Sequence, residues 1–206
     1  MYWAHRTGAI GEDHFGGRRG RNIEEAIILL DSWITERWRK GKIVAGLFLD
    51  INSAYPAVHR EKLVQILTQK QAPDYIIAIL SSFLQFRHTE LRLDSYKSQM
   101  RLLERGLPQD SPLSVILYLL YNSELLDMNL GPAKPNWLSI GYVDNIIHLF
   151  PADTTLEATI GMEDLGRRVI EWGRKMCSKF NKKKTKLMLF NSPKGEQRQA
   201  KFGRNN

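Results

Sequence analysis

Cysteine and long apolar runs are both scarce in this 206-residue sequence, and each scarcity excludes a class of protein. The single cysteine, Cys177, excludes an intramolecular disulfide and a cysteine-rich zinc site, which suits a reducing compartment. The densest apolar run, residues 115–121, is far too short to cross a bilayer, and the first residues hold no apolar core of signal-peptide length. We therefore expect an intracellular protein with no membrane partner.

Basic residues are concentrated near the C-terminus. Residues 167–206 contain 13 Lys/Arg and 2 Asp/Glu, whereas residues 1–166 contain 17 and 20. The block "KFNKKKTK" (179–186) suits contact with a polyanion, because each lysine beside a phosphate releases condensed counterions. A solvated, solubilising face explains the charge equally well, so charge alone leaves both interpretations open.

Hydrophobic periodicity predicts an α+β fold in which helices cover one face of a small antiparallel sheet. A helix is expected to begin at the N-cap Asn22, and a buried strand is expected to end at Asp50. Alternating and helical patterns predict the remaining elements, which are helices at 60–69, 73–86, 111–128 and 154–180, hairpins around 94–96 and 143–145, and a strand at 184–190. Residues 131–136 are expected to break the pattern, and 193–206 to be a basic, disordered tail.

Two carboxylates occupy matching places in this pattern. Asp50 ends an apolar strand and Asp144 lies at a hairpin tip. A carboxylate on a buried strand is costly unless it is paired or binds a cation, and two of them on neighbouring strands suit Mg²⁺. Taken singly, each has an ordinary explanation, since Asp50 could cap a turn and Asp144-Asn145 could be hairpin-turn chemistry.

Five motifs in collinear order indicate a more specific role for Asp50 and Asp144. They resemble the fingers and palm motifs of reverse transcriptases, above all those of fungal non-LTR (LINE-like) retrotransposons. The motifs are "HFGGRRGRN" (14–22), "FLDINSAYPAV" (48–58), "GLPQDSPLSVILYLLYN" (106–122), "GYVDNIIHLF" (141–150) and "KFNKKKTKLMLF" (179–190). The resemblance implies a right-hand polymerase without its thumb, with a fingers segment at 1–45 and a palm at 46–192 that carries a fingers-like insertion at about 60–104.

The resemblance implies an RNA-directed DNA polymerase with an RNA template, a primer strand and dNTP as partners. Asp50 and Asp144 match the metal-binding aspartates, and the carbonyl of Ile51 would be a further ligand of two Mg²⁺ ions, with Mn²⁺ as a substitute. Localisation would be nuclear, and the missing thumb and endonuclease regions would belong to a full-length element.

The same resemblance implies roles for five other residues. Tyr55 matches the aromatic residue under the incoming sugar, and Gln109 the residue that lines the nucleotide pocket. Lys184 resembles the lysine near the leaving pyrophosphate, although Lys182 and Lys183 leave its register open. The remaining two, which resemble the fingers arginines that hold phosphates, are Arg18 and Arg21.

Two residues depart from the family pattern at the implied catalytic site. Asn145 stands where the family has a second aspartate, so the site loses a charge that binds metal. Asp110 stands where the family has glycine, adding bulk and negative charge near an incoming triphosphate. Two hypotheses follow: a truncated and weakened polymerase domain, or a catalytically inactive nucleic-acid-binding remnant of one.

Overall fold

The strand predicted before Asp50 is the centre of the main sheet in the computed structural model, which describes residues 2–129 and 137–190. β1 (Ile43–Asn52) pairs antiparallel with β7 (Asn145–Ala152) along one edge. Its other edge pairs with β9 (Lys186–Phe190) and, farther along, with the short β8 (Lys179–Phe180). β6 (Leu138–Tyr142) pairs with β7 and completes the sheet.

One face of the sheet packs on two helices that the sequence predicts. α6 (Pro112–Leu126) and α7 (Thr155–Lys175) share a large apolar core with alternate residues of β1, among them Leu47 and Leu49. The side chain of Thr154 accepts a hydrogen bond from the Glu157 N–H and begins α7. α6 is apolar almost all round because other elements cover it on several sides.

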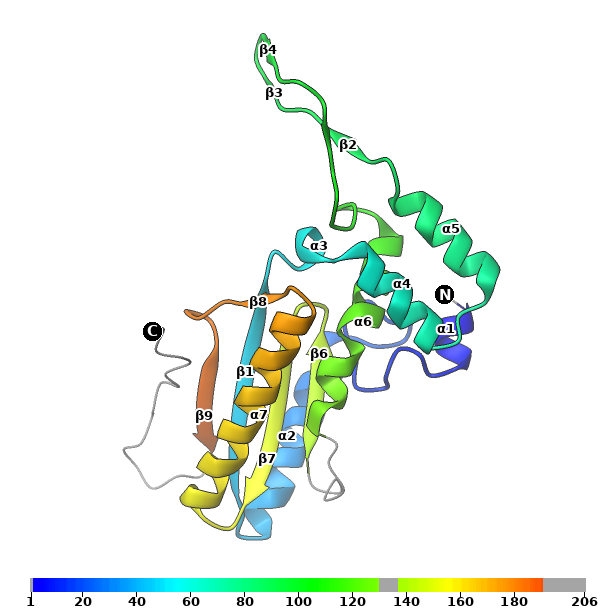
Figure 1. Ribbon diagram of the computed structural model, residues 1–206. Coiled ribbons are helices and arrows are strands. Elements are labelled where there is room, and N and C mark those ends of the chain that lie inside the picture. The colour runs from blue at the N-terminus through cyan, green and yellow to red at the C-terminus, as the bar shows by residue number, and fades with distance from the viewer. Residues whose placement is uncertain (1, 130–136, 191–206) are drawn as a thin grey trace.

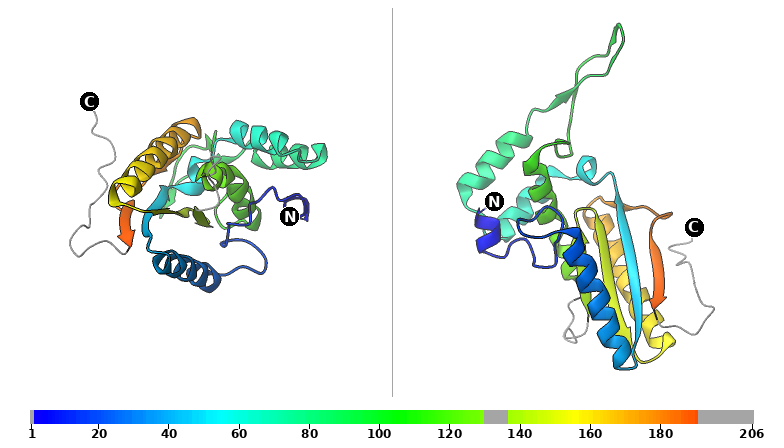
Figure 2. Two further views of the ribbon diagram at one scale, coloured as in Figure 1. Left: turned by 90° about the horizontal axis from the view of Figure 1, so that it is seen from below. Right: turned by 180° about the vertical axis from the view of Figure 1, so that it is seen from behind.

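The expectation that helices cover a single face is wrong. α2 (Ile23–Arg39) lies on the opposite face from α7, as the two views of Figure 2 show. Its apolar stripe buries Trp33 and Ile34 against Val44 and Leu149 of the sheet. β1 reads as a continuous apolar run because it is covered on both faces. The predicted start of α2 is confirmed, since Asn22 Oδ1 accepts a hydrogen bond from the Glu25 N–H at 2.8 Å.

The remaining elements surround the end of the sheet that carries Asp50 and Asp144 or project from it. The two helices predicted at 60–69 and 73–86 are α4 (Arg60–Gln69) and α5 (Asp74–Leu84). Three shorter helices are α1 (Tyr2–Arg6), α3 (Ala54–Ala57) and the 3₁₀ helix η1 (Asp127–Asn129). The predicted hairpin around Asp94 becomes a long arm that leaves the body beyond α5 (Figure 1). Its paired strands are β2 (His88–Thr89) with β5 (Arg101–Leu102), and β3 (Arg92–Leu93) with β4 (Tyr96–Lys97).

Some sequence-based expectations fall outside the described residues. They are the pattern break at 131–136 and the basic tail at 193–206. Within the described residues, no helix combines the length and apolarity needed to cross a membrane.

Candidate active site

The register of β1 and β7 brings the two predicted aspartates to the same end of adjacent strands. Asp50 lies directly opposite Asn145, the residue after Asp144. One residue farther along, the Ile51 N–H donates a hydrogen bond to the Asp144 carbonyl oxygen at 3.2 Å. The ladder therefore fixes Asp50 beside the hairpin tip, as the sequence predicts.

A strained turn presents Asp144. β6 and β7 are joined by Val143 and Asp144 alone, and Val143 has φ +57°. A β-branched residue in this left-handed region is a genuine outlier, and such strain persists only where the surroundings hold it. Asn122, fully buried in α6, donates from Nδ2 to the Val143 carbonyl oxygen at 2.8 Å. Asn122 is therefore one of the groups that hold the turn that carries Asp144.

The glycine-rich loop before α2 supports the same turn from the other side. A Cβ added to Gly16 would lie 2.9 Å from the Val143 backbone nitrogen, too close for any side chain. Gly17 has φ +75°, and its Cβ would lie 2.4 Å from a methyl group of Val115 in α6. The two glycines thus allow this loop to lie directly against the Val143 turn and α6.

Lys184 reaches Asp50 from the third side of the site. Its Nζ lies 3.1 Å from Asp50 Oδ1, and the Asn181 N–H donates to the Asp50 carbonyl oxygen at 2.8 Å. The Asp50 side chain is 13% exposed and that of Lys184 is 66% exposed, so the ammonium covers a mostly buried carboxylate. Of the three lysines 182–184, Lys184 is the one that forms an ion pair with Asp50 in the described structure, and its role beside the pyrophosphate stays a prediction.

Asn145, the departure from the family pattern, makes a weak contact with its neighbour. Its Nδ2 lies 3.4 Å from Asp144 Oδ1, and its position opposite Asp50 puts both side chains on one face of the sheet. An aspartate here would place two like charges directly across the strands. The amide avoids that repulsion and supplies one neutral oxygen in place of a carboxylate.

Two tyrosines lie under the carboxylates. The rings of Tyr55 and Tyr118 are 5.4 Å apart, and burial together with the charge of Asp144 raises the pKa of both. The Asp50 charge also contributes to the raised pKa of Tyr118. Tyr118 is only 1% exposed, and its hydroxyl has no hydrogen-bond partner within the described part of the chain. An orphaned hydroxyl thus lies within the field of both carboxylates.

Gln109 and Tyr55 line one groove, and its binding of a nucleotide stays a prediction. Asp110, Ser111 and Pro112 continue its wall. Asp110 has φ +62°, the left-handed conformation that favours glycine and that aspartate tolerates better than most residues. The backbone shape typical of glycine is therefore kept at Asp110, while a carboxylate is added to the groove.

The donor set suits a divalent cation. Asp50, Asp144 and the Ile51 carbonyl supply the oxygen ligands that Mg²⁺ prefers, and the orphaned Tyr118 hydroxyl could bond a metal-bound water. The Lys184 ammonium already provides a positive charge beside Asp50. The described residues contain no group of three or more His, Cys, Asp or Glu that could hold a metal, so any site here depends on two carboxylates and neutral oxygens.

The two fingers arginines make contacts within their own loop. Arg18 Nη1 donates to the Gly11 carbonyl oxygen at 2.7 Å, and the Arg21 guanidinium lies 4.9 Å from the centre of the Phe15 ring. The loop touches the Val143 turn through Gly16, but in the described structure neither arginine forms a hydrogen bond or ion pair with Asp50 or Asp144. Their binding of phosphate stays a prediction.

Asn122 and Tyr118 lie near the site, and the sequence patterns predict no role for either of them. Asn122 carries a signal that could have been used, because it is an amide at the end of the apolar run 115–121. A buried polar side chain needs a partner, and here the partner is a turn 21 residues away in sequence. Tyr118 gives no such signal, because tyrosine is common in cores.

The fold resembles that of solved telomerases. Telomerase from Candida tropicalis, in complex with a TWJ fragment of telomeric RNA, superposes with a TM-score of 0.72 at 11% identity, covering 93% of this chain and 33% of that one. The apo enzyme truncated from its C-terminal domain gives 0.69 at 10% identity, covering 94% and 39%. The likeness confirms the α+β fingers-and-palm fold.

The sequence is similar to curated retrotransposon proteins. The RNA-directed DNA polymerase from mobile element jockey of Drosophila funebris is 25% identical over 186 residues, which are 89% of this chain and 20% of that protein. Its counterpart from Drosophila melanogaster is 24% identical over 186 residues, with the same shares. The chain thus spans about a fifth of the length of these relatives. Residues 3–202 match the family described as reverse transcriptase (RNA-dependent DNA polymerase), and the chain belongs to that family.

Proposed function

We propose that this chain is the fingers and palm of an RNA-directed DNA polymerase from a non-LTR retrotransposon, acting on an RNA template, a primer strand and dNTP. The observation that carries the proposal is the β1–β7 ladder, which holds Asp50 beside the turn that bears Asp144. The curated relatives are RNA-directed DNA polymerases of mobile elements, which supports the substrate class. Placement on the fungal branch and in the nucleus rests on the motif resemblance alone.

The residues divide the work of nucleotidyl transfer. Members of the family use divalent metals, and a pair of Mg²⁺ ions would activate the primer 3′-hydroxyl and neutralise the triphosphate. Asp50, Asp144 and the Ile51 carbonyl would hold the ions. Tyr55 would lie under the incoming sugar, and Gln109 would line the nucleotide pocket.

Lys184 has a second role in this account. Its ammonium lies 3.1 Å from Asp50 Oδ1 and neutralises that carboxylate. A divalent cation held by Asp50 would compete with this ammonium, which would also stabilise charge on the leaving pyrophosphate. The fingers arginines Arg18 and Arg21 would contact template or triphosphate only if their present contacts with Gly11 and Phe15 give way.

Asn145 and Asp110 both indicate a weakened enzyme. Asn145 removes one charge from the metal site, and Asp110 adds one to the nucleotide groove. The same two residues support the second candidate, an inactive remnant that binds nucleic acid. The two candidates differ in one measurable respect, since only the first incorporates nucleotides.

Primer extension on an RNA template separates the candidates. The chain, Asp50→Asn and Asp144→Asn are compared in Mg²⁺ and in Mn²⁺, with Asp31→Asn on the exposed face of α2 as the matched control. We expect slow incorporation by the chain and by the control, and none by the two active-site variants. Incorporation only after the double change Asn145→Asp with Asp110→Gly would instead identify an inactive remnant on an intact fold.

A further inference from the structure

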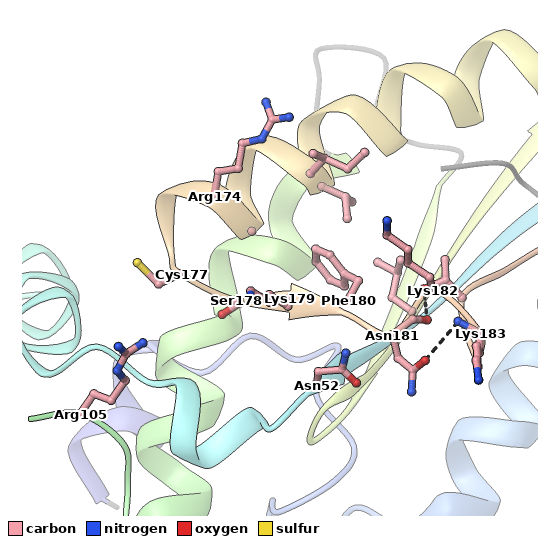
Figure 3. Close-up of a pocket in the computed structure, with 15 residues that line it drawn as sticks. Asn52, Arg105, Arg174, Cys177, Ser178, Lys179, Phe180, Asn181, Lys182 and Lys183 are labelled. Atoms are coloured by element: carbon pink, nitrogen blue, oxygen red, sulfur yellow. Dashed lines mark hydrogen bonds between the residues drawn. The ribbon is translucent and has the colours of Figure 1, made fainter. Parts of the chain in front are cut away.

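A second hollow, of about 860 Å³, lies between the C-terminal half of α7, β8 and the end of β1 (Figure 3). Its apolar lining includes Val169, Ile170 and Phe180. It shares no lining residue with the groove that contains Tyr55 and Gln109. It is therefore a separate site on the molecule.

Cations surround this hollow and no acid lines it. The lining contains five basic residues, which are Arg105, Arg174, Lys179, Lys182 and Lys183. All five are exposed, and none forms an ion pair within residues 2–129 and 137–190. Nearby lysines behave differently, since Lys175 pairs with Glu124 at 2.8 Å. The pocket cations are thus available to an anion from outside the chain.

The walls of the hollow are firmly built. The Ser178 N–H donates to the Gly173 carbonyl oxygen at 2.8 Å, and the ring of Phe180 packs 6.2 Å from that of Trp172. The side chain of Asn181 accepts from the Lys183 N–H at 3.1 Å, as the dashed line between them in Figure 3 shows. A preformed hollow loses little conformational entropy when a ligand enters.

We propose that this hollow binds the sugar–phosphate backbone of a single nucleic-acid strand, outside the catalytic groove. The five cations come from three separate parts of the chain and are spread along the lining of one hollow, which suits several successive phosphates better than one compact anion. The apolar lining, with Phe180, offers a surface for a sugar or an unstacked base. Residues 167–190, the described part of the basic C-terminal stretch, contain nine Lys/Arg and one Asp/Glu, so the elements that line the hollow carry a net positive charge.

The hollow is also linked to the metal site. Asn181 lines it and donates its N–H to the Asp50 carbonyl oxygen, and the same loop carries Lys184. A strand held here would consequently lie beside the loop that contacts Asp50. Binding does not depend on catalysis, so this proposal stands or falls separately from polymerase activity.

The sequence supplies its own reporter, because its only cysteine, Cys177, lines the hollow and is exposed. A fluorophore on Cys177 is titrated with a short single-stranded RNA, without dNTP or metal. The control carries the same fluorophore on Ser32→Cys in a Cys177→Ser background, at an exposed position of α2. We expect a saturable change at Cys177 and none at the control position.

Substitution of the basic residues that line the hollow tests whether they bind the RNA. Arg174→Ala with Lys179→Ala should weaken RNA binding roughly tenfold and lower the slope of log K against log salt by about 1.4, or 0.7 for each lost phosphate contact. Lys175→Ala, which removes the paired lysine next to Arg174, should leave both nearly unchanged. Arg174→Lys with Lys179→Arg keeps the charge and should retain binding.

Either of two results would overturn the proposal. One is the same loss of binding free energy per removed charge in Lys175→Ala as in Arg174→Ala with Lys179→Ala, which would mean that only net charge matters. The other is competition by a nucleoside monophosphate as strong as that by the oligonucleotide at equal phosphate concentration, which would make the ligand a free nucleotide. Because the titration contains neither dNTP nor metal, its outcome does not depend on nucleotide incorporation, which separates this test from that of the polymerase.

Discussion

The Nζ of Lys184 lies 3.1 Å from Oδ1 of Asp50, although the residues are 134 positions apart in sequence. The contact brings a cation from the loop after β8 to the carboxylate at the end of β1. Under the proposed function, a divalent ion held by Asp50 would compete with this ammonium. We therefore expect Lys184 to lower the affinity of Asp50 for metal.

Removing that ammonium should strengthen metal binding. Lys184→Ala is expected to bind Mn²⁺ about two- to fivefold more tightly, since an exposed ion pair contributes about 0–1 kcal/mol. Titration followed by electron paramagnetic resonance measures the free ion. Lys183→Ala is the matched control, because it removes the same charge from the next residue without a contact to Asp50. Equal effects of the two variants on Mn²⁺ affinity would show that the contact of Lys184 with Asp50 does not affect metal binding.

Asn145→Asp, which restores the second aspartate of the family pattern, should lower the stability of the fold and raise its affinity for metal. Asn145→Asp places a carboxylate directly opposite Asp50, and like charges so placed are destabilising by about 0.2–1 kcal/mol. In EDTA the variant should melt below the unmodified chain, and Mg²⁺ should raise its melting temperature more. Gln65→Glu makes the same amide-to-carboxylate change on an exposed site of α4 and should show neither effect. Identical Mg²⁺ responses of the unmodified chain and Asn145→Asp would contradict this.

Loss of the Asn122 side chain should lower both the stability of the fold and nucleotide incorporation. Asn122→Ala leaves the Val143 carbonyl oxygen without its 2.8 Å partner, which should lower the free energy of unfolding by about 1–3 kcal/mol. Nucleotide incorporation at a temperature where the variant is fully folded should also fall, because the turn that carries Asp144 is released.

Ser123→Ala is the comparison for that experiment. Its Oγ donates to the Leu120 carbonyl oxygen within α6, so its loss should change stability by about 1 kcal/mol and leave incorporation intact. Parallel losses of activity in the two variants would mean that α6 as a whole, and not the bond to Val143, supports the site.

Two buried histidines should make the fold sensitive to acid. Burial lowers the pKa of His14 and of His148 to about 3. An unfolded histidine titrates near 6.5, so between pH 6.5 and 3 the unfolded chain binds protons that the folded chain does not. Stability is therefore complete above about pH 7 and falls as the pH decreases, by about 2 kcal/mol for each histidine at pH 5.

Denaturant unfolding at pH 7.5 and pH 5 checks this. His148→Gln should lower stability at both pH values and remove about 2 kcal/mol of the difference between them. His88→Gln, on the exposed arm, should leave the difference unchanged. A difference that survives in both His14→Gln and His148→Gln would assign the acid sensitivity to other groups.

The sequence predicted the elements and the catalytic strands well because their signals are local. The apolar run before Asp50 and the polar tip at Asp144 are visible without any tertiary information, and both lie where expected. The second layer formed by α2 was missed because the stripe containing Trp33 and Ile34 does not say which face of the sheet it covers. That choice depends on how the chain crosses the sheet.

Contacts between distant segments account for the other omissions. The bond of Asn122 to Val143 and the packing of Gly16 on the same turn join parts of the chain that no pattern relates. The left-handed φ of Asp110 explains why glycine suits this position. The sequence alone does not reveal this backbone conformation, because an aspartate in a loop is common. The pocket cations could be counted in the sequence, but their common opening could not.

The most direct test of the central claim is a double-mutant cycle on Mn²⁺ binding with Asp50→Asn, Asp144→Asn and the two combined. If both carboxylates share the cation, each single change should weaken binding by about tenfold or more, and the double change should weaken it far less than the product of the two. Effects that multiply would mean that Asp50 and Asp144 act independently, and the two-carboxylate metal site would be wrong.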